Sequence, residues 1–120
     1  MGTPVPRRSS GLILTCLVVA LVLAFATPAQ AHFTRAFEGL DYASVGSEHR
    51  WTEVCDMEKD GHGVFADFLD SNYRLIFRLR DPNGSAGGCG NQWAGQNIYH
   101  YIFCEDWWGS PNECTSIRNT

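Results

Sequence analysis

The sequence predicts an all-β fold, a small antiparallel sandwich or barrel-like sheet held together by two disulfides. Three features favour this class. Short apolar runs alternate at a spacing of two, turn residues separate them, and several cysteines follow the N-terminal segment. Short strands with turns between them and no convincing helix are typical of an antiparallel sandwich.

Residues 1–31 have the pattern of a secretory signal peptide. Arg7 and Arg8 form a basic start, the run 11–26 is apolar, and Ala29-Gln30-Ala31 offers the small residues of a cleavage site. The apolar run is shorter than the about 20 residues that a membrane-spanning helix needs. We therefore expect a secreted, extracellular protein that begins at His32, in preference to an uncleaved N-terminal anchor.

The chain is acidic, which bears on its partners. The full sequence has 9 lysines and arginines against 13 aspartates and glutamates. Loss of Arg7 and Arg8 with the signal peptide increases this excess. Nucleic acids and anionic membranes attract positive surfaces. We therefore expect the partner to be an extracellular protein or a cell-envelope component. We expect no binding to nucleic acid, and none to the membrane after cleavage. We expect the protein to be a monomer.

The cysteines predict the covalent frame. Of the 5 cysteines, Cys16 lies in the apolar run, and the others are Cys55, Cys89, Cys104 and Cys114. An even number in a short exported chain predicts disulfides, and three pairings are possible. We expect Cys55–Cys89 and Cys104–Cys114, because the second pair closes a short loop. Without a C-x-x-C pair a metal site is disfavoured, and we predict no cofactor.

The segment 32–49 is the least regular part of the exported chain. Phe33, Phe37 and Leu40 fall at helical spacing, but two glycines interrupt the pattern. We expect an N-terminal loop or frayed helix here, followed by the all-β, disulfide-bonded domain over 50–120.

The rest of the chain has three strand signals. Two apolar-rich runs between 50 and 69 flank Asp60-Gly61, which predicts a hairpin. The run "YRLIFRLRD" from Tyr73 alternates apolar and arginine residues and is the clearest strand. After a glycine-rich loop around Cys89, "IYHYIFCE" is apolar at nearly every position, as in a strand buried on both faces.

Within the predicted hairpin, "DMEKDG" at 56–61 has oxygen ligands at alternate positions and then a glycine. This pattern is typical of the first half of a calcium-binding loop. The second half departs from it, because Gly63 occupies the apolar position and Asp67 replaces the closing glutamate. The flanking segments also have strand patterns, so the sequence favours a hairpin over a calcium site.

Two further groups have alternative interpretations. Arg74, Arg78 and Arg80 suit either an anion site or a cross-strand charge ladder, and the excess of acids favours the ladder. The acids expected in it are Glu53, Asp56, Glu58 and Asp67. His49 and His100 with acids and arginines are the residue types of a small secreted hydrolase or nuclease, but no motif joins them. We therefore predict no enzyme and no catalytic residues.

The run "CEDWWGSPNEC" between Cys104 and Cys114 holds Trp107 and Trp108. The two side chains either cover the protein's own core or contact a partner. A disulfide-closed loop loses little conformational freedom on binding, and tryptophan is a frequent interface anchor. We predict that Trp107 and Trp108 contact the partner, with Trp93 as support.

Several of these motifs resemble a group of small secreted, disulfide-bonded actinobacterial proteins of unknown function. The shared elements are the V-C-D-x-E-x-D-G core at 54–61, the D-x-N-G turn at 81–84 before a cysteine, Cys104-Glu105, and a final cysteine. The resemblance implies an exported, disulfide-bonded fold and nothing about mechanism. In size, acidity and two-disulfide design the chain also resembles exported protease and amylase inhibitors, although its cysteine spacing matches neither family.

Together these features predict a secreted, non-enzymatic binding module of unknown target, either an inhibitor of an extracellular enzyme or a cell-envelope-associated protein. The alternatives are the small secreted hydrolase or nuclease and a structural extracellular protein.

Overall fold

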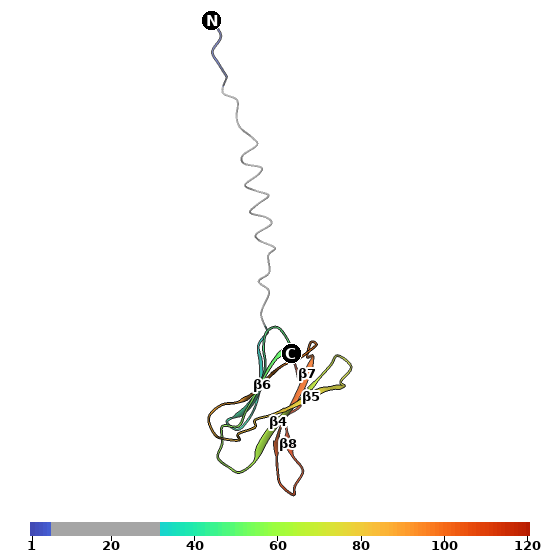
Figure 1. The fold of residues 1–120 in the computed structure, drawn as a ribbon. Coiled ribbons are helices and arrows are strands. Elements are labelled where there is room, and N and C mark those ends of the chain that lie inside the picture. Colours follow the sequence, from blue (N-terminus) through green and yellow to red (C-terminus); the bar gives the residue numbers. More distant parts are fainter. Residues whose placement is uncertain (6–31) are drawn as a thin grey trace. The chain divides into compact units, whose positions relative to one another are not determined.

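Two antiparallel sheets pack face to face in the part of the chain that the computed structural model describes, residues 1–5 and 32–120 (Figure 1). The predicted signal sequence, 1–31, lies outside the described residues from position 6 onward. Residues 31–120 form one compact unit. No helix of the described residues has the length and apolar character to cross a membrane.

Each sheet is built from strands that are far apart in the sequence. The first sheet has the order β1-β2-β3-β6, with β1 (Thr34–Glu38), β2 (Asp41–Val45), β3 (Trp51–Cys55) and β6 (Gly90–Trp93). The second has β5-β4-β7-β8, with β9 also paired to β7. Its strands are β4 (Gly63–Leu69), β5 (Leu75–Arg80), β7 (His100–Asp106), β8 (Glu113–Cys114) and β9 (Arg118–Asn119). The predicted all-β sandwich is confirmed, and its sheets are open rather than closed into a barrel.

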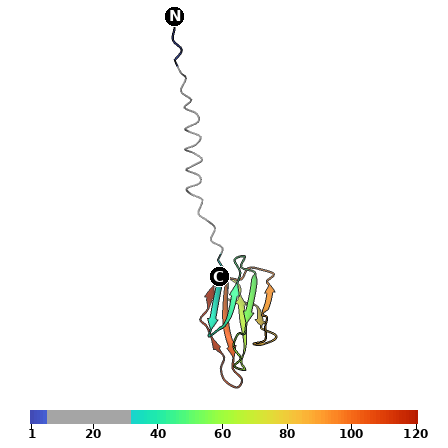
Figure 2. The same ribbon diagram turned by 90° about the vertical axis from the view of Figure 1, so that its left-hand side faces the viewer.

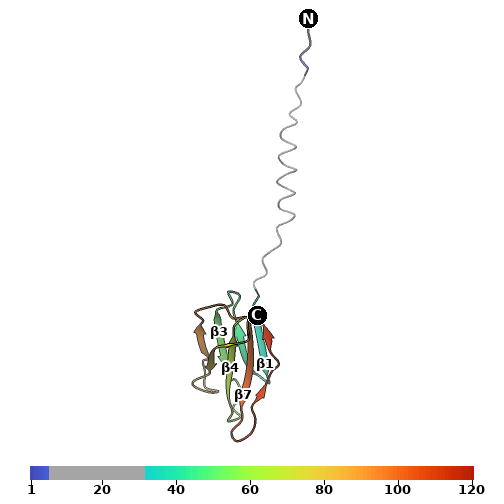
Figure 3. The same ribbon diagram turned by 90° about the vertical axis from the view of Figure 1, so that its right-hand side faces the viewer.

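The core lies between the inner faces of the two sheets. Alternate residues of β4, namely Val64, Ala66 and Phe68, point inward with Tyr101 and Phe103 of β7. The first sheet adds mainly small residues from β1, β2 and β3: Ala36, Ala43, Val45 and Val54. The larger side chains of the core therefore come mainly from the second sheet. Figure 3 shows two of its strands, β4 and β7, running side by side.

The expected N-terminal loop or frayed helix over 32–49 is wrong, because this segment forms the antiparallel hairpin β1–β2. Gly39 has φ +59° in the turn between the two strands, a conformation that glycine adopts readily. Ala36 and Ala43 face each other in register and are fully buried. The helical spacing of Phe33, Phe37 and Leu40 was misleading, since all three side chains are exposed.

The hairpin expected around Asp60-Gly61 is also wrong. β3 pairs with β2 and β6 in the first sheet, whereas β4 pairs with β5 and β7 in the second. Residues 56–62 therefore carry the chain from one sheet to the other, and we call them the crossover loop. The turn signal of Asp-Gly is real, but local turn chemistry does not decide which sheet the next strand joins.

The strand after Tyr73 forms as predicted, with a change at its start. The register between β4 and β5 shifts between Phe68 and Leu69, so Phe68 pairs with Phe77 and Leu69 with Leu75. The extra residue, Ile76, packs against the core, while Leu75 is exposed. A β-bulge of this kind cannot be read from alternation alone. The glycine-rich segment, expected as loop throughout, contains the short strand β6.

Both predicted disulfides are present. Cys55 at the end of β3 bonds Cys89, which directly precedes β6, and Cys104 of β7 bonds its cross-strand neighbour Cys114 of β8. Each bond therefore joins neighbouring segments of one sheet. Disulfides of this kind are typical of an oxidising, extracellular environment.

Truncation of the central aromatic residue tests the core. Phe68 is fully buried, and its ring lies 5.1 Å from that of Phe77 and 5.9 Å from that of Tyr101. We expect Phe68→Ala to lower the free energy of unfolding by about 3–5 kcal/mol, and Phe68→Leu by about 1–2 kcal/mol. Urea unfolding measures both. Leu75→Ala, at an exposed position, is the matched control and should cost less than about 1 kcal/mol; equal losses at both positions would contradict the described packing.

Candidate functional site

Three loops meet at one end of the sandwich. They are the crossover loop, the turn after β5 at 81–89, and the segment 107–112, which the Cys104–Cys114 bond closes and which we call the disulfide loop. The disulfide loop projects from the end of the sandwich away from the C-terminus (Figure 2). Polar contacts between the three loops make this acidic end the candidate site.

Two buried carboxylates hold the crossover loop. Asp41, the first residue of β2, is 1% exposed, and its Oδ1 accepts the backbone N–H groups of Met57 and Glu58. Asp81 accepts the backbone N–H of Asp56 through Oδ2 at 3.0 Å. Charge-assisted bonds of this kind are stronger than neutral ones. The loop therefore takes its conformation from acids that lie in other elements.

Asp56 is the least satisfied group of the site. It is 4% exposed, and its buried Oδ1 has no hydrogen-bond partner. Burial, and after it the negative charge of Asp41, raises the pKa of Asp56 from 3.8 to about 6. Asp41 itself has a raised pKa, chiefly because it is buried. The protein thus holds both carboxylates in an environment that disfavours their charged form.

A groove of about 310 Å³ opens beside these groups. Asp56, Glu58 and His62 of the crossover loop line one side, and Asn83 and Gly84 of the turn after β5 line the other. Its lining thus combines two carboxylates, the imidazole of His62 and the amide of Asn83 with small residues.

A second group connects the crossover loop to the disulfide loop. His62 Nδ1 lies 3.1 Å from Oε1 of Glu105 and 3.8 Å from Oδ2 of Asp60. Trp107 donates its indole N–H to Oε2 of Glu105 at 3.0 Å, and its ring centroid lies 3.9 Å from that of His62. Burial raises the pKa of Glu105, and the carboxylate of Asp60 raises it further.

The three tryptophans predicted to bind a partner occupy different environments. Trp107 is partly buried in the group just described, while Trp108 is 88% exposed. Trp93 on β6 is 59% exposed and packs against Trp51, with ring centroids 5.5 Å apart. Trp51 begins β3 and the crossover loop follows its last residue, so Trp93 lies at the opposite end of that strand. Trp107 and Trp108 are therefore brought to the acidic end, and Trp93 is not.

The histidines of the hydrolase alternative engage the C-terminal tail. His49 Nδ1 lies 2.9 Å from Oγ1 of Thr120, and His100 Nδ1 lies 2.8 Å from Oδ1 of Asn119. His100 also stacks on Tyr73, with centroids 4.1 Å apart. Within residues 32–120 neither histidine has a carboxylate within ion-pair distance, whereas His62 has two.

The arginines of β5 form ion pairs on the outer face of the second sheet. Arg78 makes two bonds to Asp67, at 2.6 and 2.7 Å, and Arg80 bonds Asp106 at 2.8 Å, with Phe65 beneath both guanidinium groups. Arg74 pairs with Asp70. The charge ladder is thus the observed arrangement. Of its four expected acids only Asp67 takes part, because the others belong to the first sheet or the crossover loop.

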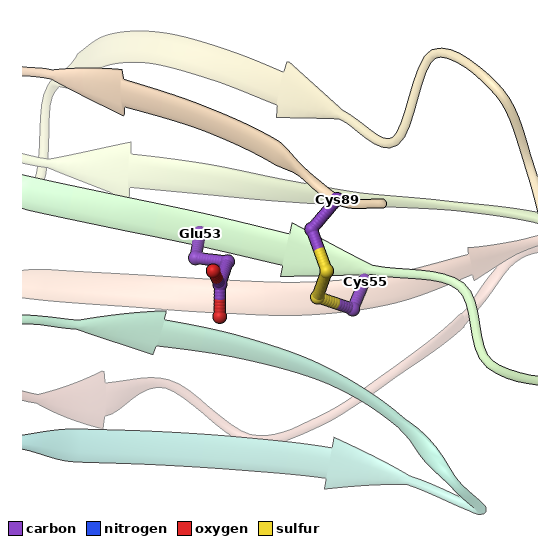
Figure 4. A group of neighbouring side chains, drawn as sticks. All are labelled: Glu53, Cys55 and Cys89. Carbon is purple, nitrogen blue, oxygen red and sulfur yellow. A yellow bond between two sulfur atoms is a disulfide. The ribbon is translucent and has the colours of Figure 1, made fainter. Parts of the chain in front are cut away.

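Glu53, Cys55 and Cys89 also lie close together on the first sheet (Figure 4). The two sulfur atoms are bonded to each other, so neither is a thiolate that binds a metal. Glu53 accepts the hydroxyl of Tyr42 at 2.9 Å. This group is part of the frame of the sheet.

Sequence reasoning missed Asp41, His62 and Glu105. Asp41 lies in a segment expected to be loop or helix, and its contact with the crossover loop depends on the pairing of β2 with β3. His62 directly follows the Asp-Gly turn, and Glu105 directly follows a cysteine. The sequence signal available for Glu105 was its carboxylate at the end of a strand that is otherwise nearly all apolar.

Comparisons with known proteins add no relative. No protein-family model matches the chain, and neither the search of curated proteins nor that of solved structures finds a significant match.

The buried carboxylate of Asp56 gives a testable pH dependence. Its pKa in the folded state, about 6, lies above its ordinary value of 3.8, so the folded state keeps this proton to higher pH. Its contribution to the free energy of unfolding therefore falls as the pH rises from about 4 to 6 and stays low above that range. We expect Asp56→Asn to raise the free energy of unfolding at pH 7 by on the order of 2 kcal/mol, and the gain to vanish near pH 4.

Urea unfolding of wild type and variant across this pH range measures the difference. Asp70→Asn is a control of opposite sign, because the backbone N–H of Arg74 lowers the pKa of Asp70 and its charge therefore stabilises the fold at neutral pH. If Asp56→Asn is less stable than wild type at pH 7, or if the difference in unfolding free energy does not change with pH, the charge of Asp56 does not destabilise the folded state.

Proposed function

We propose that the protein is an exported, non-enzymatic binding module whose contact surface is the disulfide loop. The single observation that carries the proposal is the position of Trp108, which is 88% exposed on a loop closed by a disulfide. Exposure of a large aromatic side chain is unfavourable in water. Contact with a partner removes that cost, and tryptophan is among the most frequent anchors of protein interfaces.

The rigidity of the loop supports this role. Its base is fixed by the Cys104–Cys114 bond and by pairing of β7 with β8. Trp107 holds the interior, because its backbone N–H donates to Oδ1 of Asn112 at 3.2 Å and its indole N–H to Glu105. A loop that is ordered before binding loses less conformational entropy in the complex. Trp107 thus positions the loop, and Trp108 makes the contact.

The charge around Trp108 limits the kind of partner that can bind there. Glu113 at the base of the disulfide loop is exposed, and Asp60 of the neighbouring crossover loop is exposed as well. A partner with an apolar pocket rimmed by lysine or arginine side chains complements this surface. The target in this proposal is an extracellular protein with such a pocket, for example an enzyme that the loop inhibits.

Capture experiments with matched tryptophan variants test the proposal. The bait is the oxidised protein, the sample is the set of secreted proteins and cell-wall material of the source culture, and affinity for a captured protein is then measured by calorimetry. We expect Trp108→Ala to weaken binding by roughly thirtyfold or more, the loss typical of an interface anchor, with an unchanged melting temperature.

Two further variants serve as controls. Trp93→Ala changes an equally aromatic but distant surface and should leave the affinity unchanged. Trp107→Phe removes the indole N–H and should lower the melting temperature, since Glu105 then loses a donor. If Trp108→Ala binds like wild type while Trp93→Ala does not, the contact surface lies on the first sheet and the proposal is wrong.

A further inference from the structure

The outer face of the first sheet carries a group of aromatic side chains. Along β1, β2 and β3 the core residues alternate with residues that point outward. We call this outer surface the aromatic face, and its aromatic residues are Phe33, Phe37, Tyr42, Trp51 and Trp93. Phe33, Phe37 and Trp93 are each more than half exposed. Exposed apolar surface of this kind is typical of an interaction site.

Two opposite charges stand on the aromatic face, and neither has an ionic partner. The guanidinium group of Arg35 lies over three aromatic rings, with the shortest distance, 4.1 Å, to the ring centroid of Tyr42. Glu53 accepts the hydroxyl of Tyr42 through Oε1. Between positions 32 and 120, no acid lies within ion-pair distance of Arg35 and no base within that distance of Glu53. Aromatic contacts hold the guanidinium group in place but do not neutralise its charge.

The two charges lie in one row across the sheet, with β2 between them. Arg35 is the cross-strand partner of Ser44, and Ser44 is in turn the partner of Glu53. Neighbouring strands are about 4.8 Å apart, which places the backbones of Arg35 and Glu53 about 10 Å apart. Tyr42 contacts both charged groups and lies between them. The aromatic face therefore has a positive charge on β1 and a negative charge on β3.

We propose that two copies of this chain form a symmetric dimer through their aromatic faces, in place of the monomer expected from the sequence. A two-fold axis that runs along β2, in the plane of the interface, places β1 of each copy over β3 of the other. Arg35 of one copy then faces Glu53 of the partner subunit, and this pair occurs twice. An axis that runs across the strands, along the row, would instead oppose like charges. With the axis along β2 the face is complementary to itself, as a two-fold interface requires.

A second copy fits this face better than a partner whose surface has a single sign of charge. A basic surface, of the kind proposed to receive Trp108, would repel Arg35, and an acidic surface would repel Glu53. A purely apolar surface would remove both charges from water without pairing them, which is unfavourable. A second copy supplies one carboxylate and one guanidinium group at the required spacing, together with aromatic side chains that exclude water around them.

Sedimentation equilibrium of the oxidised protein tests the proposal. The face spans four short strands, so we expect a small and weak interface, with a dissociation constant on the order of 10⁻⁵–10⁻⁴ M. The weight-average mass should therefore rise from that of one chain at about 1 μM toward that of two chains at about 1 mM.

Charge reversal locates the interface. Arg35→Glu and Glu53→Arg each convert both ion pairs of the dimer into like-charge contacts. We expect each variant alone to dimerise at least about tenfold more weakly than wild type. An equimolar mixture of the two variants should form a heterodimer with close to wild-type affinity, because each reversed residue then faces a residue of opposite charge. Restored binding in the mixture would also show that both variants are folded.

Two further variants serve as controls. Lys59→Glu makes the same change of charge on the exposed part of the crossover loop and should dimerise like wild type. Trp108→Ala should also dimerise like wild type, because the disulfide loop lies outside the aromatic face. Thermal unfolding of every variant measures whether its fold is intact.

Any of four results would overturn the proposal. The first is a mass of one chain at about 1 mM protein. The second is a dimer that Arg35→Glu and Glu53→Arg both retain in full. The third is a mixture of these two folded variants that associates no more strongly than either alone. The fourth is a dimer that is lost in Trp108→Ala, which would place self-association on the disulfide loop. Binding of a captured partner through Trp108 is measured separately, so failure of the dimer leaves the proposed function standing.

Discussion

The bonds from Asp41 to the backbone of the crossover loop are the interaction on which the acidic end depends. The chain must pass from the first sheet to the second after Cys55, and the segment that does so has no strand pairing of its own. Asp41 accepts two of its N–H groups, and Asp81 accepts a third. Buried backbone donors need such acceptors. Carboxylates accept strongly, but using them concentrates negative charge, and that charge gives this end of the sandwich its chemistry.

The outer face of the second sheet and the acidic end balance charge in different ways. On the outer face of the second sheet, arginines of β5 neutralise acids of β4 and β7 one by one. At the acidic end the acids face one another, and the pKa of Asp56 is raised to about 6. His62, which ends the crossover loop, lies against Trp107, with ring centroids 3.9 Å apart, and so joins this loop to the one that presents Trp108.

Local patterns in the sequence predict much of the second sheet and little of the first. The strands β5 and β7 follow from an alternating pattern and an apolar run, which are local signals. Both disulfides follow from the even number of cysteines and from the short loop between Cys104 and Cys114. The hairpin β1–β2 was missed because its core residues, Ala36, Ala43 and Val45, are small, while the larger side chain of Phe37 is exposed. The crossover was missed because an Asp-Gly turn has the same local chemistry whether or not the strands beside it pair. Asp41 depends on strand register and has no local signal, whereas the motif at 56–61 was visible but assigned to a hairpin.

The central claim is that the contacts among His62, Glu105 and Trp107 hold the disulfide loop in the conformation that presents Trp108. Amide NMR spectra of the ¹⁵N-labelled, oxidised protein, recorded for wild type and for His62→Ala, test it most directly. The account predicts that the Trp107 indole N–H signal and the backbone signals of the disulfide loop shift in the variant, while the signals of β1 and β2 stay in place. Indole and loop signals that are unchanged in His62→Ala would contradict it.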